Sequence, residues 1–367
     1  MKKTRYFLFP LLVALTFWII LRESSLTQIF DCLRTCSPSA LAAAIGCMVV
    51  FVLCEAANLQ RCLRLTGRSP QTCAETVFSD SKRARVRFSK QALPYALTGF
   101  FFSGITPFAS GGQPMQLYHM HKDGISAARG AAALAMELAS FQAAAVTIAA
   151  IGLLRFHALI LQTSGFAGTF LLLGFAVNLS LLALLLCAIL SPRLLARASA
   201  LIAGLLQKLR ACKATRLRAA TGRWVEDYQN CAACLRDMPG EAVLLFLTSL
   251  LQLAALHSIP YWVSLSLGMQ QVSLPQMLSI QAVLFLFVSV IPLPGGAGAG
   301  EGGFLLLFAS IFSGGYLQSA MLLSRFASFY LPLLLSGLFL WIQNLRNSRR
   351  ESSYRFKAQR EDFFKYF

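Results

Sequence analysis

Charged side chains are scarce in this sequence. Asp, Glu, Lys and Arg make up 13% of its 367 residues, while hydrophobic residues make up 56%. A soluble domain carries about 25% charged residues, so this chain has too few to cover a globule of its size. Apolar runs of roughly 17 to 25 residues, the length that crosses about 30 Å of hydrocarbon, recur along the chain, and the mean hydropathy is +0.62. The composition predicts an all-α polytopic membrane protein.

Patterns for metal binding and catalysis are also missing. The ten cysteines and four histidines are scattered, and Cys231 and Cys234 form a lone C-x-x-C with no second pair nearby. Free thiols are therefore favoured over a zinc or redox site. His119 and His121 have no convergent set of carboxylates or cysteines, and His257 is expected to be a buried, hydrogen-bonded histidine. We predict no catalytic residue, no metal and no cofactor.

The N-terminus lacks a signal-peptidase site. Basic residues in positions 1–5 precede an apolar run at 6–21, as in a signal peptide, but no small-x-small site follows. We therefore expect a retained first span. Six apolar runs are long enough to cross a membrane: 6–21, 39–59, 127–154, 166–190, 241–267 and 317–344.

Two further apolar regions, 91–121 and 276–313, are each interrupted by a Pro/Gly cluster. The net charge of +18 is concentrated in the loops 61–90 and 191–240 and in the tail after 345, which carry eight, nine and seven Lys/Arg. All three should be cytoplasmic. This requires 91–121 to enter and leave from the cytoplasmic side and 276–313 from the outer side. The charges thus predict two re-entrant helical hairpins and cytoplasmic termini.

The two interrupted regions resemble each other in sequence. Residues 102–107, FSGITP, followed by Gly111 and Gly112, parallel residues 288–292, VSVIP, followed by Gly295 and Gly296. Broken segments in two halves of opposite orientation are typical of transporters with a site near the midplane. An inverted repeat is therefore one hypothesis, and chance similarity is the other.

The stretch IPLPGGAGAGEGG, residues 291–303, contains a pattern that suggests nucleotide binding. Gly298, Gly300 and Gly303 spell G-x-G-x-x-G, but that fingerprint needs a preceding strand in a soluble βαβ unit. The flanking runs are apolar and long, so we reject a nucleotide site.

A helix break at membrane depth survives only where protein buries it or where it lines a wet cavity. The half-helix that follows offers free N–H groups and a positive dipole end to a phosphate or carboxylate. Pro114 suits the first position of such a helix. The alternative is that the breaks serve only helix packing. The anion-binding positions predicted on the two hairpins are Gly111, Gly112, Gln113, Pro114, Gly295 and Gly296.

Four ionisable residues lie in or beside apolar runs: Glu55, Glu137, Glu301 and Arg325. A charge at the bilayer centre costs about 2.5 to 3.5 kcal/mol, so each should face a partner or a cavity. Arg325 is the candidate for a phosphate because guanidinium has bidentate donors. Glu301 or Glu137 is predicted to pair with Arg325 or to take up protons, with a static structural pair as the alternative. Glu55, near the end of its span, is expected only to reach the interface.

The residues from Arg193 to Arg218 carry an apolar stripe at helical spacing beside basic residues. This pattern predicts an amphipathic helix that lies either on the anionic inner leaflet or on the protein's own cytoplasmic face.

Two motifs resemble a known family. The first is TPFASGGQP, residues 106–114, followed by GIS at 124–126; the second is PLPGGAGAGEGG, residues 292–303, followed by SRFASFY at 324–330. Together they resemble the transmembrane region of lysylphosphatidylglycerol synthase, the multiple peptide resistance factor, and its stand-alone YbhN-like, flippase-like relatives. The resemblance covers nearly the whole chain.

The resemblance implies a bacterial inner-membrane protein that moves lysylphosphatidylglycerol-like lipids between leaflets and so confers resistance to cationic peptides. Residues 1–345 would be one flippase-like domain and 346–367 a basic cytoplasmic tail. By position, it implies functional roles for Gly111, Gly112, Gln113, Pro114, Gly295, Gly296, Glu301 and Arg325.

The resemblance has one departure. Full-length synthases add a C-terminal domain that transfers lysine from lysyl-tRNA, and no such domain follows residue 345 here. The alternative function is therefore the membrane part of a phosphatidylglycerol lysyltransferase with a separate catalytic chain, and a non-transporting scaffold is a third. Expected partners are phospholipids and a soluble aminoacyltransferase, with no direct binding of nucleic acid. The lipid and the oligomeric state, a homodimer included, stay open.

Overall fold

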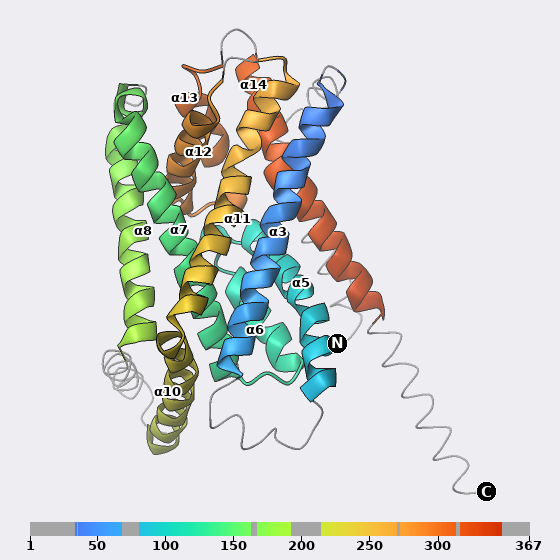
Figure 1. Cartoon of the computed structure of the whole chain (residues 1–367), viewed down its shortest axis with the longest axis vertical. Coiled ribbons are helices and arrows are strands. Elements are labelled where there is room, and N and C mark those ends of the chain that lie inside the picture. The colour runs from blue at the N-terminus through green and yellow to red at the C-terminus, as the bar shows by residue number, and fades with distance from the viewer. Residues whose placement is uncertain are drawn as a thin grey trace, which may run out of the picture.

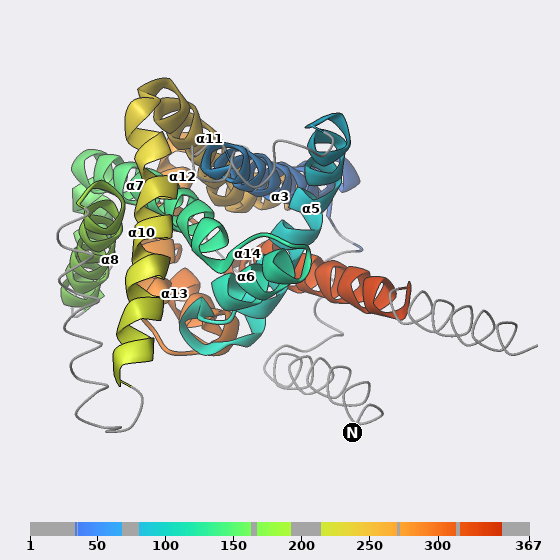
Figure 2. The ribbon, with the colours of Figure 1, turned by 90° about the horizontal axis from the view of Figure 1, so that it is seen from below.

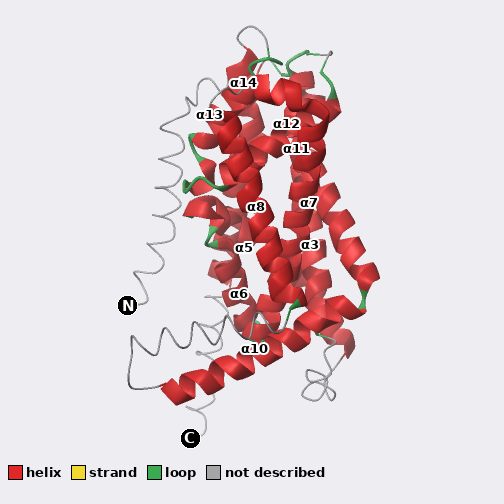
Figure 3. Cartoon of the chain, turned by 90° about the vertical axis from the view of Figure 1, so that its left-hand side faces the viewer, coloured by secondary structure: helices red, strands yellow, loops and turns green. Residues whose placement is uncertain are grey.

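The computed structural model describes residues 34, 36–67, 81–162, 167–191, 214–269, 272–312 and 316–346. All regular structure in these ranges is helical (Figure 3). Five helices are long and apolar enough to cross a membrane: Pro38–Thr66, Ala127–Phe156, Leu172–Leu190, Pro239–Ser266 and Tyr316–Arg346. The chain is thus an all-α, multi-pass membrane protein, as its composition predicts. The span predicted at 6–21 and the tail from 347 lie outside the described residues.

The spans follow the predicted apolar runs, with extensions at their ends. Helix α3 (Pro38–Thr66) begins with a proline at its first position, after Ser37 in an extended conformation, and ends at Gly67. Helices α7 (Ala127–Gln162), α8 (Ala167–Leu190) and α11 (Pro239–Ser266) make three further spans. The last span joins α14 (Tyr316–Arg325) to a π-helical turn, η3 (Phe326–Tyr330), and continues to Arg346.

Leucines cover the outer faces of several spans. Protein buries only 17% of the apolar window of α8, and Leu172, Leu184 and Leu190 on that helix are at least half exposed. Such faces would be unstable in water and are stable against hydrocarbon, since the backbone groups are all paired inside the helix. The exposure pattern fits helices that face lipid on one side and one another on the other.

The interior holds two apolar clusters toward opposite ends of the bundle. One contains Met48, Ile259, Met277 and Phe308 and joins α3, α11, α14 and the second hairpin. The other joins α3, α5, α6, α7, α10 and α11; it contains Leu59, Tyr95, Met120, Ala132 and Leu245. Beside these clusters, the side chains of Glu137 and Gln252 are buried. The bundle therefore holds polar groups within its apolar interior.

Both interrupted regions are helical hairpins that start at opposite ends of the bundle (Figure 1). The first runs through α5 (Ser81–Ile105), the short turn η1 (Pro107–Ala109) and α6 (Gly112–Lys122), which packs back on α5. The second runs through α12 (Leu274–Ser289), the turn η2 (Pro294–Gly296) and α13 (Ala299–Leu307), which packs back on α12. This is the arrangement that the charge distribution predicts.

Two predicted loops are shorter than expected. The region 61–90 contains the end of α3 and the start of α5, and the region 191–240 contains α10 (Ala214–Asp237). Helix α10 lies across one end of the bundle and contacts α7 and α8 (Figures 2 and 3). The sequence reading missed it because basic residues at 216, 218 and 223 interrupt the apolar pattern. Most of the amphipathic helix predicted at 193–218 lies outside the described residues.

Candidate functional site

The tips of the two hairpins meet, since η1 and η2 are in contact, and most of their residues are exposed. Their backbones match closely. Thr106 (φ −114°, ψ 146°) and Leu293 (φ −112°, ψ 139°) are extended, each precedes a proline, and the residue after each proline has φ of 54° (Phe108) or 60° (Gly295). Two tips of opposite direction therefore adopt the same turn.

The matching turns correct the sequence alignment of the two hairpins. In the structure Pro107 corresponds to Pro294, so Phe108 and Ala109 (both φ 54°) occupy the positions of Gly295 and Gly296 (φ 60° and 65°). The sequence comparison instead aligned Pro107 with Pro292, because it relied on the Gly-Gly pairs. In both tips a proline is followed by two residues with left-handed backbone. The two turns therefore match in backbone conformation although their residues differ.

Arg325 holds the second tip in place. Its Nε lies 2.6 Å from Oε1 of Glu301, and its Nη2 donates to the carbonyls of Gly295 and Gly296 at 3.2 and 3.3 Å. The ring of Phe329 lies under the guanidinium, 5.1 Å away. Of the two carboxylates predicted as partners of Arg325, Glu301 is thus the one it contacts, and Glu137 is not.

Two atoms of this ion pair remain available. Oε2 of Glu301 is buried and has no hydrogen-bond partner, and Nη1 of Arg325 has no acceptor among the described residues. Tyr330 donates its hydroxyl to the other oxygen of Glu301, at 3.3 Å. An unpaired buried carboxylate oxygen is rare and costly, so this position is a candidate for a ligand with both a donor and an acceptor.

The glycines of the first hairpin are closely packed. The N–H of Gly111 donates to Oγ1 of Thr106 at 2.8 Å, and a Cβ on Gly112 would lie 2.9 Å from the carbonyl oxygen of Gly99 on α5. Helix α6 begins at Gly112, which makes Pro114 its third residue rather than its first. Proline is tolerated there because first-turn N–H groups lack helical partners.

A second polar cluster lies where α3, α7 and α11 cross. The carboxyl groups of Glu55 and Glu137 lie within interaction distance of each other, and Nε2 of Gln252 donates to Oε2 of Glu55 at 2.8 Å. The prediction that Glu55 reaches only the interface is therefore wrong. It failed because α3 continues beyond the apolar run to Thr66, which moves Glu55 away from the helix end.

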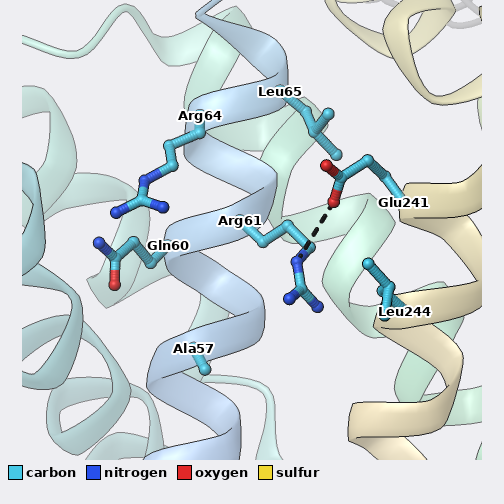
Figure 4. Close-up of a pocket in the computed structure, with 7 residues that line it drawn as sticks. All are labelled: Ala57, Gln60, Arg61, Arg64, Leu65, Glu241 and Leu244. Atoms are coloured by element: carbon cyan, nitrogen blue, oxygen red, sulfur yellow. Dashed lines mark ion pairs between the residues drawn. The ribbon is translucent and has the colours of Figure 1, made fainter. Parts of the chain in front are cut away.

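A pocket of about 340 Å³ opens between α3 and α11 near the end that α10 covers (Figure 4). Nε of Arg61 lies 3.3 Å from Oε2 of Glu241, and Nη1 donates to Thr248 at 3.4 Å. Arg64 and Gln60 point to the opposite side of α3 from Glu241 in Figure 4. The lining residues are Ala57, Gln60, Arg61, Arg64, Leu65, Glu241 and Leu244. Sequence reading missed this site because both arginines were assigned to a loop.

The histidines and cysteines give no cluster for a metal among the described residues. His257 is fully buried as predicted, but neither ring nitrogen has a hydrogen-bond partner there, and the ring packs on Phe285 at 5.6 Å. The predicted hydrogen bond is therefore missing. Cys231 and Cys234 are both buried in α10.

A comparison with curated proteins found no similar sequence. A comparison with protein families found a match over residues 7–336, which spans both hairpins, the Arg325–Glu301 pair, four of the five described spans and the fifth as far as residue 336. The family is described as the lysylphosphatidylglycerol synthase TM region. Because the match covers most of the sequence, the chain belongs to the lysylphosphatidylglycerol synthase transmembrane family.

Proposed function

We propose that this protein is a flippase that moves an anionic or aminoacylated phospholipid, such as lysylphosphatidylglycerol, between the leaflets of a bacterial inner membrane. The observation that carries the proposal is the contact of two opposed hairpin tips beside the half-buried Arg325–Glu301 pair. In many transporters, two interrupted helices of opposite orientation form the substrate site near the membrane midplane.

The free atoms of the pair suit an aminoacylated headgroup. Nη1 of Arg325 and the N-terminus of α13 would bind the phosphate, through a charge-assisted hydrogen bond and the positive end of the helix dipole. The unpaired Oε2 of Glu301 would accept from the ammonium of an aminoacyl group. A headgroup with both charges would thus satisfy both atoms at once.

The pocket at Arg61 and Arg64 would admit the headgroup from one leaflet. The positive-inside rule assigns the α10 end to the cytoplasm, so this would be the inner leaflet. Leu53 on α3 and Leu247 and Leu251 on α11 are more than half exposed beside it. The acyl tails would remain against these leucines in lipid while the headgroup moves through the protein.

Lipid flipping by the purified protein in liposomes tests the proposal. Dithionite quenching of fluorescent phosphatidylglycerol, with and without a lysyl headgroup, reports how much lipid reaches the inner leaflet. We expect headgroup-dependent flipping that falls to background in Arg325→Ala and Glu301→Gln. Arg155→Ala, which removes an exposed arginine at the end of the α7 span, is the control and should flip lipid at the wild-type rate. Wild-type rates in both folded site variants would contradict the proposal.

The family name favours a second function, that of the membrane part of a phosphatidylglycerol lysyltransferase. In that case a separate soluble aminoacyltransferase would supply the chemistry and this chain would hold the lipid. Supplying lysyl-tRNA and such an enzyme to the liposomes tests it. Lysylphosphatidylglycerol formation that depends on this chain, without flipping of any lipid, would favour the second function.

A further inference from the structure

The polar cluster of α3, α7 and α11 lies at about half the depth of the membrane. Glu137 is ten residues from the start of α7, Glu55 eleven from the end of α3 and Gln252 thirteen from the start of α11. At 1.5 Å per residue these positions are roughly 15 to 20 Å from the α10 end, within a hydrocarbon core of about 30 Å. The cluster therefore lies within the hydrocarbon core, away from both ends of these spans.

The contact between Glu55 and Glu137 needs a proton. A carboxylate only accepts hydrogen bonds, so two carboxyl groups can bond to each other only if one is protonated. Two negative charges at this separation would also repel strongly in a medium of low dielectric. Glu137 is 4% exposed and Glu55 is half-buried, so Glu55 is the side through which a proton would enter or leave.

No cation lies in position to neutralise the pair within the part of the chain that the structure describes. Arg61 on α3 is paired with Glu241 of α11, and Arg129 on α7 donates to the carbonyl of Leu63. The buried thiol of Cys62 is the other titratable group that interacts with both glutamates. His257 lies further along α11 against Phe285.

Among the described side chains, the other helices that pack on these spans give the pair no charged partner. His119, His121 and Lys122 stand in the last turn of α6, and Arg325 of α14 is paired with Glu301. Helices α8 and α12, which pack on α7, contain no charged residue. On α5, which packs on α3, the hydroxyl of Tyr95 is bonded to Asp123. On α10, Cys231 interacts with Arg129 rather than with the pair. A proton is therefore the charge available to compensate two adjacent glutamates.

Two buried acceptors in the same cluster lack a donor, so the cluster has room for an additional proton. Oδ1 of Asn58 and Oε1 of Gln252 have no hydrogen-bond partner, although both residues are fully buried. Asn58 donates to Ser249 at 3.0 Å, and Ser249 and Ser140 share a hydrogen bond of 2.9 Å.

Each of the three helices supplies two of these groups, three residues apart and so on one helix face. The pairs are Glu55 with Asn58, Glu137 with Ser140, and Ser249 with Gln252. A network with spare acceptors can accept a proton donor in more than one arrangement.

We propose that Glu55 and Glu137 form a proton-binding site and that its protonation drives lipid movement. The second half of this inference rests on the proposed function. Loss of the proton would leave two adjacent negative charges, which push α3 and α7 apart. Helices α3 and α11 both contact η3, the turn that directly follows Arg325. A change in their spacing would therefore reach the hairpin tip.

Infrared spectroscopy tests proton binding without any lipid substrate. The purified wild-type protein should show a protonated carboxyl C=O stretch that titrates with pH and shifts in D₂O. Glu137→Gln and Glu55→Gln should each abolish this titration. Glu226→Gln, which changes an exposed glutamate of α10, is the matched control and should leave it intact. A band that titrates unchanged in both buried-site variants would overturn the proposal. If Glu137→Gln does not fold, Glu55→Gln, at the half-buried position, still decides the question.

The flipping assay tests coupling. We expect wild-type rates to change on the order of tenfold per pH unit on one side of the midpoint, as for one required proton, and the two Gln variants to lose this dependence. Pyranine inside the liposomes should record proton movement together with the lipid. Flipping that is independent of pH in the wild type would refute coupling while the flippase assignment stands. Flipping that follows sodium instead, with no titrating band, would overturn the proton as the coupling ion. Absence of all flipping would refute the proposed function, and the infrared titration would still judge the proton site.

Discussion

At the scale of single residues, the proposed function gives the Arg325–Glu301 pair both a structural and a chemical role. It fixes the carbonyls of Gly295 and Gly296 at the tip, yet Nη1 and Oε2 stay free for a ligand. Stability alone would not account for this salt bridge, because a buried ion pair often contributes no more to the free energy of unfolding than well-packed apolar residues do. The unpaired oxygen is the feature that distinguishes a binding pair from a static one.

A double-mutant cycle should separate the two roles. Arg325→Met or Glu301→Leu alone should lower the free energy of unfolding by about 3–5 kcal/mol, since each leaves an unpaired buried charge, and the double variant should lose much less. Denaturant titration in detergent measures this. Flipping should be lost in all three variants. Recovery of flipping in the double variant would mean that the pair only positions the hairpin.

Neighbouring glycines of α13 give a sharper test of the arginine's position. A Cβ on Gly300 would lie 2.8 Å from Nη2 of Arg325, whereas a Cβ on Gly302 would meet nothing within 4 Å. Gly300→Ala should displace the guanidinium, stop flipping and destabilise by about 1–3 kcal/mol, as overpacking does. Gly302→Ala, the control, should keep flipping and stabilise by about 0.4–1 kcal/mol. Thermal unfolding and the dithionite assay measure both. Equal behaviour of the two variants would contradict the geometry of the site.

At the scale of elements, the two hairpins show one turn built from different residues. The second tip uses Gly295 and Gly296 at its left-handed positions, and the first uses Phe108 and Ala109. Left-handed backbone costs a residue with a Cβ about 1–2 kcal/mol, and such strain concentrates at functional sites. Phe108 is also 59% exposed, so packing does not explain its conformation.

Exchange of residue types between the tips should reveal this strain. Ala109→Gly should raise the free energy of unfolding by about 1 kcal/mol by removing the left-handed penalty. Gly295→Ala should lower it by more, because the new Cβ would meet the ring of Phe329, with Cε2 2.8 Å away, at a φ of 60°. Chemical denaturation compares the two. Stabilisation by Gly295→Ala would mean that the second tip does not adopt this turn.

Helix α10 has two buried thiols, Cys231 and Cys234. Burial, and next the neighbouring Cys234, raise the pKa of Cys231 to about 11. Because a raised pKa keeps the thiol protonated below it, only the small thiolate fraction could react near neutral pH. Maleimide should therefore label Cys231 slowly at pH 7 and faster as the pH rises toward 11. Gly222→Cys, at an exposed position of the same helix, should react quickly. Fast labelling of Cys231 at pH 7 would show that α10 leaves the bundle.

At the scale of the whole molecule, the proposed function depends on which end of the bundle faces the cytoplasm. The positive-inside rule predicts that it is the α10 end. In intact bacteria, a membrane-impermeant maleimide should label Tyr316→Cys, a half-exposed position at the opposite end of the bundle, and should label Gly222→Cys only after the membrane is opened. The reverse order would invert the topology and place the Arg61 pocket in the outer leaflet.

The sequence by itself determined the class of this protein and the course of its chain. Hydropathy and the 3.6-residue period are local properties, so they located the five described spans. Proline and glycine act on the backbone where they stand, so they located the two hairpins. The motifs around residues 106–114 and 292–303 also pointed to the family that the match over residues 7–336 bears out.

Only the tertiary structure decided which groups meet. Glu301 pairs with Arg325 across 24 residues, and Gln252 reaches Glu55 across 197. Glu55, which its position in the sequence assigned to the interface, instead shares a buried cluster with Glu137. Helix length, crossing and rotation set these contacts, and no local pattern encodes them. The same reason explains the corrected alignment of the tips, because a turn is defined by backbone angles that different residues can adopt.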